Sequence, residues 1–286
     1  MDYQFIIKIY PSTLYPCPKS SLLQKQKKLK IGISLSGGGA RGVAHIGVLK
    51  ALLEAGIEPQ VVSGTSAGSV IGLLYGIGFT PEQMLDFVDK SKFYKLLTFG
   101  LPSGGLTKLT YLRQRLEEVL EVDDFSTLNI PLYIAITNLI NGQLEIRSSG
   151  QLIDVIVASS SIPLVFQPVK IGDALYVDGG LMCNMPVDVL LPEVDFVIGV
   201  NLMPRTNINI KKVSSVWSVA QRCFDLSILG NTNSQADLCD WLIEPDGIGN
   251  IGIFQFTKSK EIFEIGYQAA TKQIPGLKEM IKNQKE

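Results

Sequence analysis

The pattern of apolar and polar positions after residue 30 switches repeatedly between two periods. Short apolar runs typical of buried strands alternate with stretches in which apolar residues recur every three or four positions, as in helices. Strands are expected at 31–35, 61–62, 131–137, 143–147, 175–177 and 195–200, and helices at 42–56, 67–75, 109–120, 152–158, 213–229 and 259–272. The leading strand-helix-strand-helix order predicts an α/β fold whose mostly parallel central sheet carries helices on its faces.

One pair of these strands is expected to run antiparallel. The dipeptide Asn141-Gly142 separates the strands at 131–137 and 143–147, and Asn-Gly favours the tight turn of a β-hairpin. The predicted sheet is therefore mixed, with an antiparallel pair joined to a mostly parallel order.

A stretch of 19 residues without a charge, 61–79, is long enough to cross a bilayer, and glycine recurs in it at every fourth position from Gly64 to Gly76. However, it opens with two valines and a Gly-Thr-Ser-Ala-Gly turn, which leaves room for only about three helical turns. A buried helix with a glycine face explains the spacing as well as a membrane span does. We therefore favour the buried helix.

Two further apolar stretches have a less certain place. Residues 93–106 are apolar, irregular and interrupted by glycines, so they could form a flap over a cavity, meet lipid, or pack as a loop on the core. The stretch that contains Trp217, Phe224 and Leu226 has helical character, and we predict that it belongs to the core.

Composition supports a single folded unit preceded by a basic arm. Of the 286 residues, 46% are hydrophobic and 19% charged, which is enough apolar material for a sizeable core, and no linker divides the chain. The net charge of −1 combines +5 on residues 1–30 with −6 on the remainder. The arm could touch an anionic membrane surface or be a solvated tail. Without a basic field on the body, nucleic acid is not an expected partner.

The cysteines and the histidine limit which cellular location and which kinds of metal site are expected. The four cysteines, Cys17, Cys183, Cys223 and Cys239, form no C-x-x-C pair, and prolines and Lys8 interrupt the apolar N-terminus, so we expect a reducing, cytoplasmic location with peripheral membrane contact at most. His45 is the single histidine, which excludes a histidine-rich metal site. We expect neither a metal nor another cofactor.

Gly64-Thr65-Ser66-Ala67-Gly68 matches G-x-S-x-G, the nucleophile elbow of serine hydrolases. A strand is expected before it and a helix after it, and this context aims backbone N–H groups and the positive end of a helix dipole at the serine. The same pentapeptide also occurs in ordinary turns, so it needs support from elsewhere in the chain.

A glycine-rich run, Ser36 to Gly42, lies between the first strand and the first helix. Its backbone N–H groups could converge on an anion, either an oxyanion or a phosphate. The run also fits G-x-G-x-x-G, but dinucleotide binding requires an acidic residue at the end of the second strand. Glu58 precedes that strand, so we rank the nucleotide site below the oxyanion hole.

A serine nucleophile needs a proton acceptor. His45 lies 21 residues before Ser66, in the helix that starts from the glycine run, and is better explained as a packing or hydrogen-bonding residue. No histidine follows the serine, as α/β-hydrolase order would require. The best base is Asp178, which ends a predicted strand and is followed by Gly179-Gly180.

The three motifs, in this order and spacing, resemble the patatin-like phospholipases. Ala158 to Pro163 and Asn184-Met185-Pro186 are similar to the bacterial branch of that family. Where the family pattern has glycine after Ser-Ile-Pro, this chain has Leu164, which could reshape the nearby turn. The resemblance spans about residues 31–200.

The resemblance implies a three-layer α/β/α patatin-like fold and a Ser-Asp dyad, with Ser66 as nucleophile and Asp178 as general base. It implies a catalytic core at 31–200, with 201–286 as a helical extension packed on the same domain. The implied oxyanion hole consists of Gly37, Gly38, Gly39 and Ala67. The implied supporting residues are Arg41, Gly42, Gly64, Gly68, Gly179 and Gly180.

The expected activity is hydrolysis of fatty acyl esters of lipids, by a phospholipase A or lysophospholipase-like esterase. Two alternatives remain open: an acyltransferase or thioesterase on the same dyad, and a lipid-binding regulatory protein without turnover. The motifs determine neither the head group nor the oligomeric state.

Overall fold

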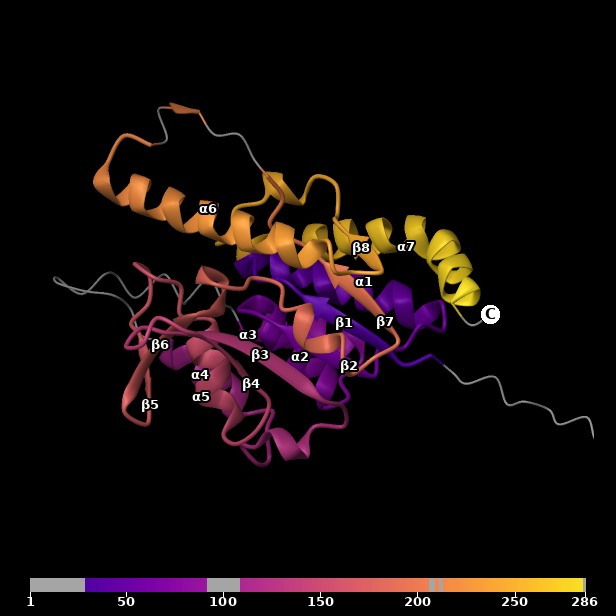
Figure 1. Ribbon diagram of the computed structural model, residues 1–286, viewed down its shortest axis with the longest axis horizontal. Helices are drawn as coiled ribbons and strands as arrows, with labels where there is room; N and C mark the ends of the chain where they lie inside the picture. The colour runs from indigo at the N-terminus through magenta and orange to yellow at the C-terminus, as the bar shows by residue number, and fades with distance from the viewer. Residues whose placement is uncertain (1–28, 92–108, 206–208, 211–212, 285–286) are drawn as a thin grey trace, which may run out of the picture.

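A central eight-stranded sheet with helices packed against it forms the protein (Figure 1). The computed structural model describes residues 29–91, 109–205, 209–210 and 213–284. The strands are β1 (Ile31–Leu35), β2 (Val61–Gly64), β3 (Leu132–Asn138), β4 (Leu144–Arg147), β5 (Val169–Ile171), β6 (Ala174–Asp178), β7 (Phe196–Val200) and β8 (Trp241–Ile243). The helices are α1 (Val43–Glu54), α2 (Ala67–Gly76), α3 (Pro81–Ser91), α4 (Thr110–Glu117), α5 (Leu152–Ser159), α6 (Val216–Ala236) and α7 (Ser259–Asn283).

The strands follow the order β5-β6-β3-β2-β1-β7-β8, and β4 also pairs with β3. The run from β3 through β8 is parallel, whereas β4 and β6 are antiparallel to β3 and β5 is antiparallel to β6. The predicted α/β fold with a mostly parallel, mixed sheet is therefore confirmed. Strands β5 and β8 were not predicted from the sequence.

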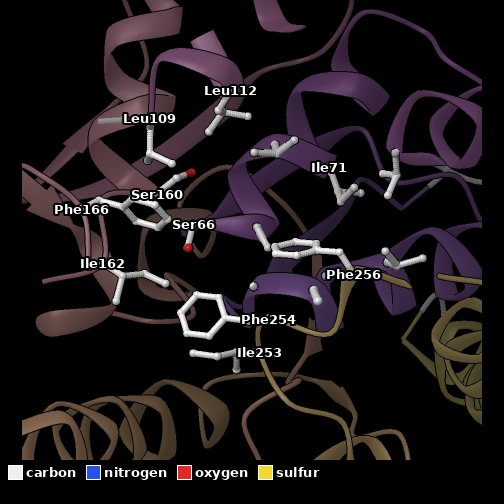
Figure 2. A pocket seen from close by; sticks show the side chains of 17 residues that line it. Ser66, Ile71, Leu109, Leu112, Ser160, Ile162, Phe166, Ile253, Phe254 and Phe256 are labelled. Atoms are coloured by element: carbon white, nitrogen blue, oxygen red, sulfur yellow. The ribbon is translucent and has the colours of Figure 1, made fainter. Parts of the chain in front are cut away.

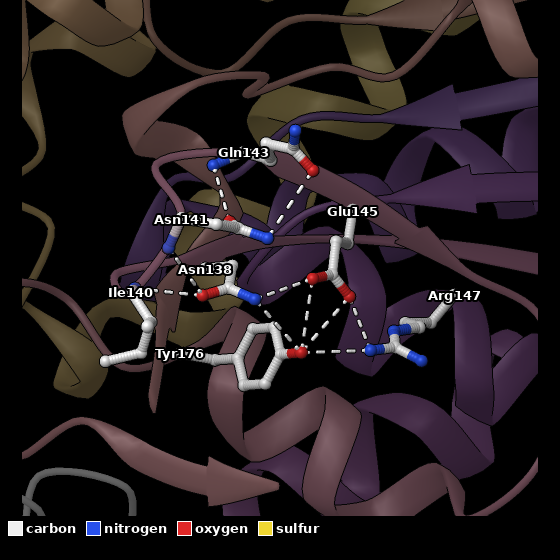
Figure 3. Close-up of polar contacts among 7 residues, drawn as sticks. All are labelled: Asn138, Ile140, Asn141, Gln143, Glu145, Arg147 and Tyr176. Carbon is white, nitrogen blue, oxygen red and sulfur yellow. Dashed lines mark hydrogen bonds and ion pairs between the residues drawn. The ribbon is translucent and has the colours of Figure 1, made fainter. Parts of the chain in front are cut away.

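The expected β3–β4 hairpin is present, and a polar network covers it (Figure 3). The side chain of Asn138 accepts a hydrogen bond from the Ile140 N–H at 2.9 Å and donates to Glu145 at 2.8 Å. The hydroxyl of Tyr176 on β6 lies between Glu145 and Arg147, and Arg147 donates to it at 3.0 Å. These contacts join the hairpin to β6, the strand that ends at Asp178.

The two faces of the sheet are covered unequally. One face packs with α1, α2, α5 and α7 into the large apolar core, which includes Val62. The preceding residue, Val61, points to the opposite face because side chains alternate along a strand. There a smaller cluster forms with Met185, Val187 and Leu190, and partly buried Ala236 of α6 packs on it.

Residues beyond 200 belong to the same packed body. Strand β8 extends the sheet beside β7, and α7 packs along α1 (Figure 1). The two helices meet at Gly47 and Gly266, where an added Cβ would overlap the backbone carbonyl oxygens of Phe263 and Ala44. The sequence predicted only helices after residue 200, and β8 corrects that expectation.

Two apolar stretches differ in outcome. Residues 61–79 form β2, the turn at Ser66 and the buried helix α2, as favoured. The stretch after Trp217 was wrongly predicted to be core: α6 buries only Ile228 and Thr232, and Trp217 and Leu226 are each half exposed. None of the helices in the described ranges combines the length and apolar character needed to cross a bilayer. The apolar stretch at 93–106, for which a flap, a lipid-facing surface and a packed loop were left open, lies outside the described residues, as does the arm up to residue 28.

Candidate active site

The first two motifs meet because β1 and β2 are parallel neighbours. Leu35 pairs with Gly64 in the register of the two strands, so both strands end at the same edge of the sheet. The glycine run leaves β1 there and enters α1, and the elbow leaves β2 and enters α2. This edge is where open α/β sheets bind their ligands.

Ser66 occupies a strained turn, as the elbow motif predicts. Its φ of 53° is rare for a residue with a side chain, and strain of this kind is concentrated at functional sites. The turn is possible because Gly64 and Gly68 approach each other and Gly68 touches the Leu35 carbonyl, leaving no room for a Cβ at either position. Ser66 is 6% exposed.

A serine triplet at the end of α5 supports both motif residues, and the sequence analysis missed this role. The Ser159 hydroxyl accepts a hydrogen bond from the Ser66 N–H at 2.9 Å and donates to the Ala135 carbonyl at 2.8 Å. The Ser161 carbonyl accepts from the Asp178 N–H at 3.0 Å. The family-like run of serines at 159–161 was the available signal.

Asp178 reaches the elbow because β6 runs against β3. Asp178 pairs with Ile136, two residues past Ile134, which pairs with Gly64 of β2. Strand β6 therefore starts beyond the edge where β2 ends and carries Asp178 back toward Ser66. Gly179 packs so closely on the Ala135 carbonyl that a Cβ there would overlap it.

The Asp178 carboxyl is buried and interacts with the nucleophile. Burial raises its pKa to about 7, although hydrogen bonds from the Gly180 N–H, at 2.7 Å, and from the Ser66 hydroxyl oppose the rise. A carboxyl with this pKa is a stronger base than an ordinary aspartate once it is ionised. The structure thus brings the two predicted dyad residues together.

His45 is not part of this arrangement. Its Nε2 lies 2.8 Å from the Ser36 carbonyl, so that nitrogen carries the proton and donates it. Burial lowers the pKa of His45 to about 4, so the ring is neutral near pH 7. The predicted hydrogen-bonding role beside the glycine run is confirmed.

The glycine run offers fewer donors than predicted. The Gly37 N–H already donates to the Asn184 carbonyl at 3.0 Å, which removes Gly37 from the expected oxyanion donors. Among the described residues, the N–H groups of Gly38, Gly39 and Ala67 have no acceptor and remain available. Gly39 has a φ of 57° and touches the Ile253 carbonyl, so a side chain would be excluded there twice over.

Arg41 anchors the glycine run to the C-terminal part of the chain. Its guanidinium donates to the carbonyls of Ile251 at 2.7 Å, Leu202 at 3.2 Å and Gly249 at 3.3 Å. The neighbouring Ala40 N–H donates to the Ile253 carbonyl at 2.8 Å. These contacts fit the supporting role implied for Arg41, because they hold the glycine run in place. Gly42 has a contact role as well, because a Cβ there would overlap that of Ala67.

An apolar cavity opens on one side of Ser66 (Figure 2). Its walls come from α1, α2, the start of α4, the end of α5 and the segment before α7. Ser160, beside Ser66, has a buried hydroxyl with no hydrogen-bond partner among the described residues. The labelled apolar residues of this wall are Ile71, Leu109, Leu112, Ile162, Phe166, Ile253, Phe254 and Phe256.

A smaller and more polar cavity adjoins the first, and Ser66 lines both. Asp178, Asn184 and Asp225 line it together with the glycine run, and Phe224 and Ile228 of α6 complete its wall. Ser66 therefore stands between an apolar space and a polar space that contains the carboxyl. No group of three or more histidine, cysteine or acidic side chains that could hold a metal occurs in the part of the chain that the structure describes.

Leu164, the departure from the family pattern, lies in a turn with an unusual backbone conformation. Leu164 has a φ of 72°, the left-handed conformation that favours glycine. The turn therefore places a residue with a side chain in a conformation that costs backbone strain.

Comparison with known proteins agrees with this geometry. The family model described as patatin-like phospholipase matches residues 33–191, more than half of the chain, and this range contains all three motifs. The chain is 27% identical to lysophospholipase nte1 of Aspergillus fumigatus over 83% of its own length and 18% of the fungal protein. It is also 27% identical to an uncharacterized NTE family protein of Mycobacterium tuberculosis, over 84% of the chain and 46% of that protein.

A solved structure of human GIVD cytosolic phospholipase A2 shares the fold. It superposes with a TM-score of 0.51 at 11% sequence identity, over 92% of this chain and 61% of the human one. The chain thus spans about a fifth of the fungal relative and less than half of the mycobacterial one.

Proposed function

Because the chain belongs to the patatin-like phospholipase family, we propose that it hydrolyses fatty acyl esters of lipids through an acyl-enzyme on Ser66. The observation that carries the proposal is that Ser66 and the buried Asp178 carboxyl line the same polar cavity, and that Ser66 also lines the adjoining apolar cavity. The apolar cavity suits an acyl chain and the polar one a leaving alcohol. A cytoplasmic location with peripheral membrane contact is part of the same proposal, and it rests on the scattered cysteines and the basic arm.

In this mechanism Asp178 takes the proton of the Ser66 hydroxyl as its oxygen attacks the ester carbonyl. The Gly38 and Gly39 N–H groups, with that of Ala67, stabilise the oxyanion, and each donor is worth about 3 kcal/mol in the transition state. Protonated Asp178 then returns the proton to the leaving alcohol, and the C–O bond breaks. Water repeats the cycle on the acyl-enzyme and releases the fatty acid.

Labelling with a fluorophosphonate tests the nucleophile. We expect the wild type to be labelled at Ser66, identified by peptide mass spectrometry, and Ser66→Ala to remain unlabelled. Ser160→Ala is a matched control because it removes another hydroxyl from the same cavity wall and should still be labelled. Labelling of Ser66→Ala would contradict the proposal.

Turnover is then measured on a panel of acyl esters that includes phospholipids and lysophospholipids. Removing a serine nucleophile lowers kcat by about 10⁴-fold or more in a related chemistry. We expect a loss of that order for Ser66→Ala on every substrate that the wild type hydrolyses. A wild type that is labelled but turns over no ester in the panel would contradict lipid ester hydrolysis and favour the two alternatives, an acyltransferase or thioesterase and a lipid-binding protein.

A further inference from the structure

Asn184 places in the polar cavity a side-chain amide that the proposed mechanism does not use. The residue is 1% exposed, yet it lines this cavity together with Ser66 and Asp178. Its backbone carbonyl accepts the hydrogen bond from the Gly37 N–H at 3.0 Å. That bond explains the position of the backbone but gives no role to the side chain, which is polar and buried beside the reacting groups.

The hydrogen-bond network determines which end of this amide faces the cavity. Asn184 Nδ2 donates to the Thr232 hydroxyl at 3.2 Å, and that hydroxyl donates its single proton to the Ile228 carbonyl at 2.6 Å. The Thr232 hydroxyl can therefore only accept from the amide. The network thus assigns the NH2 group to the side of α6 and Oδ1 to the opposite end.

Asn184 Oδ1 lies between the glycine run and the dyad. A Cβ added at Gly37 would lie 2.5 Å from this oxygen and 3.3 Å from Ser66 Cβ. A Cβ added at Gly180 would lie 3.3 Å from the same oxygen and 3.0 Å from Asp178 Oδ1. Within the described residues, no donor makes a hydrogen bond to Asn184 Oδ1. A buried amide oxygen is costly to leave without a donor, so a donor is expected to come from a molecule in the cavity.

The deacylation step provides such a donor. The water that attacks the acyl-enzyme carries two protons, and Asp178, as the base, takes one of them. The other proton stays on the water oxygen and needs an acceptor in the cavity. An alcohol that attacks in place of water has a single proton, which goes to the base, so its carbon chain would face Asn184 Oδ1 and leave that oxygen unpaired.

We propose that the Asn184 side chain binds the water of the deacylation step and so favours water over an alcohol as the acyl acceptor. The water donates to Asp178 and to Asn184 Oδ1, which turns a lone pair toward the acyl carbonyl on Ser66. Asp178 takes the first proton as the new C–O bond forms. The bond from the acyl carbon to Ser66 Oγ then breaks, Oγ receives the proton from Asp178, and the fatty acid leaves with the second proton.

This inference rests on the proposed function and deepens it. It names a residue that separates hydrolysis from acyl transfer, which the dyad and the oxyanion donors alone do not separate, because they serve both acceptors equally. A site built to accept a hydrogen bond discriminates against a molecule that lacks the matching donor.

The test measures how the acyl-enzyme divides between water and methanol. A p-nitrophenyl ester acylates Ser66 and releases p-nitrophenol, and the ratio of fatty acid to methyl ester then reports which acceptor reacted. Asn184→Leu keeps a similar branched shape but has no acceptor. At a fixed methanol concentration we expect this variant to lower the ratio of acid to methyl ester roughly 10-fold, because water loses its second hydrogen bond while methanol loses nothing.

Thr232 provides a second, independent pair of variants. Thr232→Val removes the hydroxyl that fixes the amide, so it should shift the ratio in the same direction as Asn184→Leu. Thr232→Ser retains the hydroxyl and should keep the ratio within about twofold of the wild type. This pair decides the question if Asn184→Leu does not fold, which thermal unfolding verifies for every variant.

Asn231→Ala is the matched control. The Asn231 side chain accepts from the Asn184 N–H at 2.9 Å and donates to the Gly180 carbonyl at 3.0 Å, but it does not line the polar cavity. Its loss loosens the same loop without removing the cavity acceptor, so the ratio should stay within about twofold of the wild type.

Two outcomes would overturn the proposal. If acid and methyl ester fall equally in Asn184→Leu and Thr232→Val, the side chain supports the base in both reactions and does not select water. If Asn231→Ala shifts the ratio as far as Asn184→Leu does, a general loosening of the loop is the cause. A wild type that releases no p-nitrophenol would instead contradict the proposed function itself.

Discussion

At the scale of single residues, one carboxyl sets the working pH. In the proposed mechanism Asp178 accepts the Ser66 proton only when its carboxyl is ionised, and burial raises its pKa to about 7. We therefore expect kcat/KM on a soluble ester to rise with pH through about 7 and then to level off. Asp178→Asn should lose about 10²- to 10⁴-fold. A rate that stays constant from pH 5 to pH 9 would contradict the assignment.

The same pKa predicts a cost in stability. The folded pKa lies above the unfolded value of about 3.9, so the protonated carboxyl favours the fold. This contribution is complete below about pH 4 and is lost as pH rises through about 7. Asp178→Asn should therefore raise Tm relative to the wild type at pH 8 but not at pH 4, as calorimetry at both pH values can verify.

Ser159 is a positioning residue whose loss should affect both stability and rate. Ser159→Ala removes the acceptor of the strained Ser66 N–H and a donor to Ala135, at a cost of about 1–3 kcal/mol in unfolding free energy. We expect kcat to fall while KM changes little, because the elbow moves and the acyl cavity does not. Ser160→Ala is the matched control for stability, since its hydroxyl has no described partner. A fall in unfolding free energy without a fall in kcat would reduce Ser159 to a structural role.

The site residues that the sequence predicts are those for which the proposed reaction requires a particular side chain. Ser66 and Asp178 stand out because a nucleophile and a base need particular side chains in a glycine setting. Ser159 contacts Ser66 across 93 residues, and Asn184 holds Gly37 through its backbone carbonyl. Such roles depend on which atoms the fold brings together, and no local pattern contains that information.

At the scale of elements, the contact between α1 and α7 requires glycine. Gly266→Ala would press a Cβ into the Ala44 carbonyl, and we expect it to lower the unfolding free energy by about 1–3 kcal/mol or more. Gly230→Ala in α6 is the control, because nothing lies within 4 Å of its added Cβ and helix propensity favours alanine by about 1 kcal/mol. Denaturant titrations of both variants should give opposite signs. Equal signs would show that propensity, not contact, dominates.

Strands and helices were predicted correctly where the segment was long enough to show a periodic pattern of apolar residues. The strands from β1 to β3 and the helices α1 and α2 have clear apolar patterns, whereas β5 and β8 have three residues each and show no period. The apolar content of α6 was visible, but its surroundings were not. Hydrophobicity tells that a side chain avoids water and not whether protein or lipid will replace the water.

At the scale of the whole molecule, the alternation of strands and helices predicted the class of fold. It did not predict how the residues after 200 complete the sheet, the helix packing and the cavity wall. Residues after 200 supply the edge strand β8, the helix α7 that covers α1, and the inner wall of the polar cavity. None of these shares a motif with the first 200 residues. Contacts between residues far apart in the sequence determine where β8, α7 and the cavity wall lie, so the sequence alone does not predict these positions.

The hydrogen bonds from Arg41 to the carbonyls of Gly249 and Ile251 have a consequence for folding during translation. The glycine run is among the first parts of the folded body to leave the ribosome, yet these two anchors lie more than 200 residues later. Until those carbonyls have emerged, the Leu202 carbonyl is the one backbone acceptor described for Arg41 that is already made, and the glycine run lacks two of its three anchors. We therefore expect a nascent chain to lack the proposed activity until translation has passed residue 251.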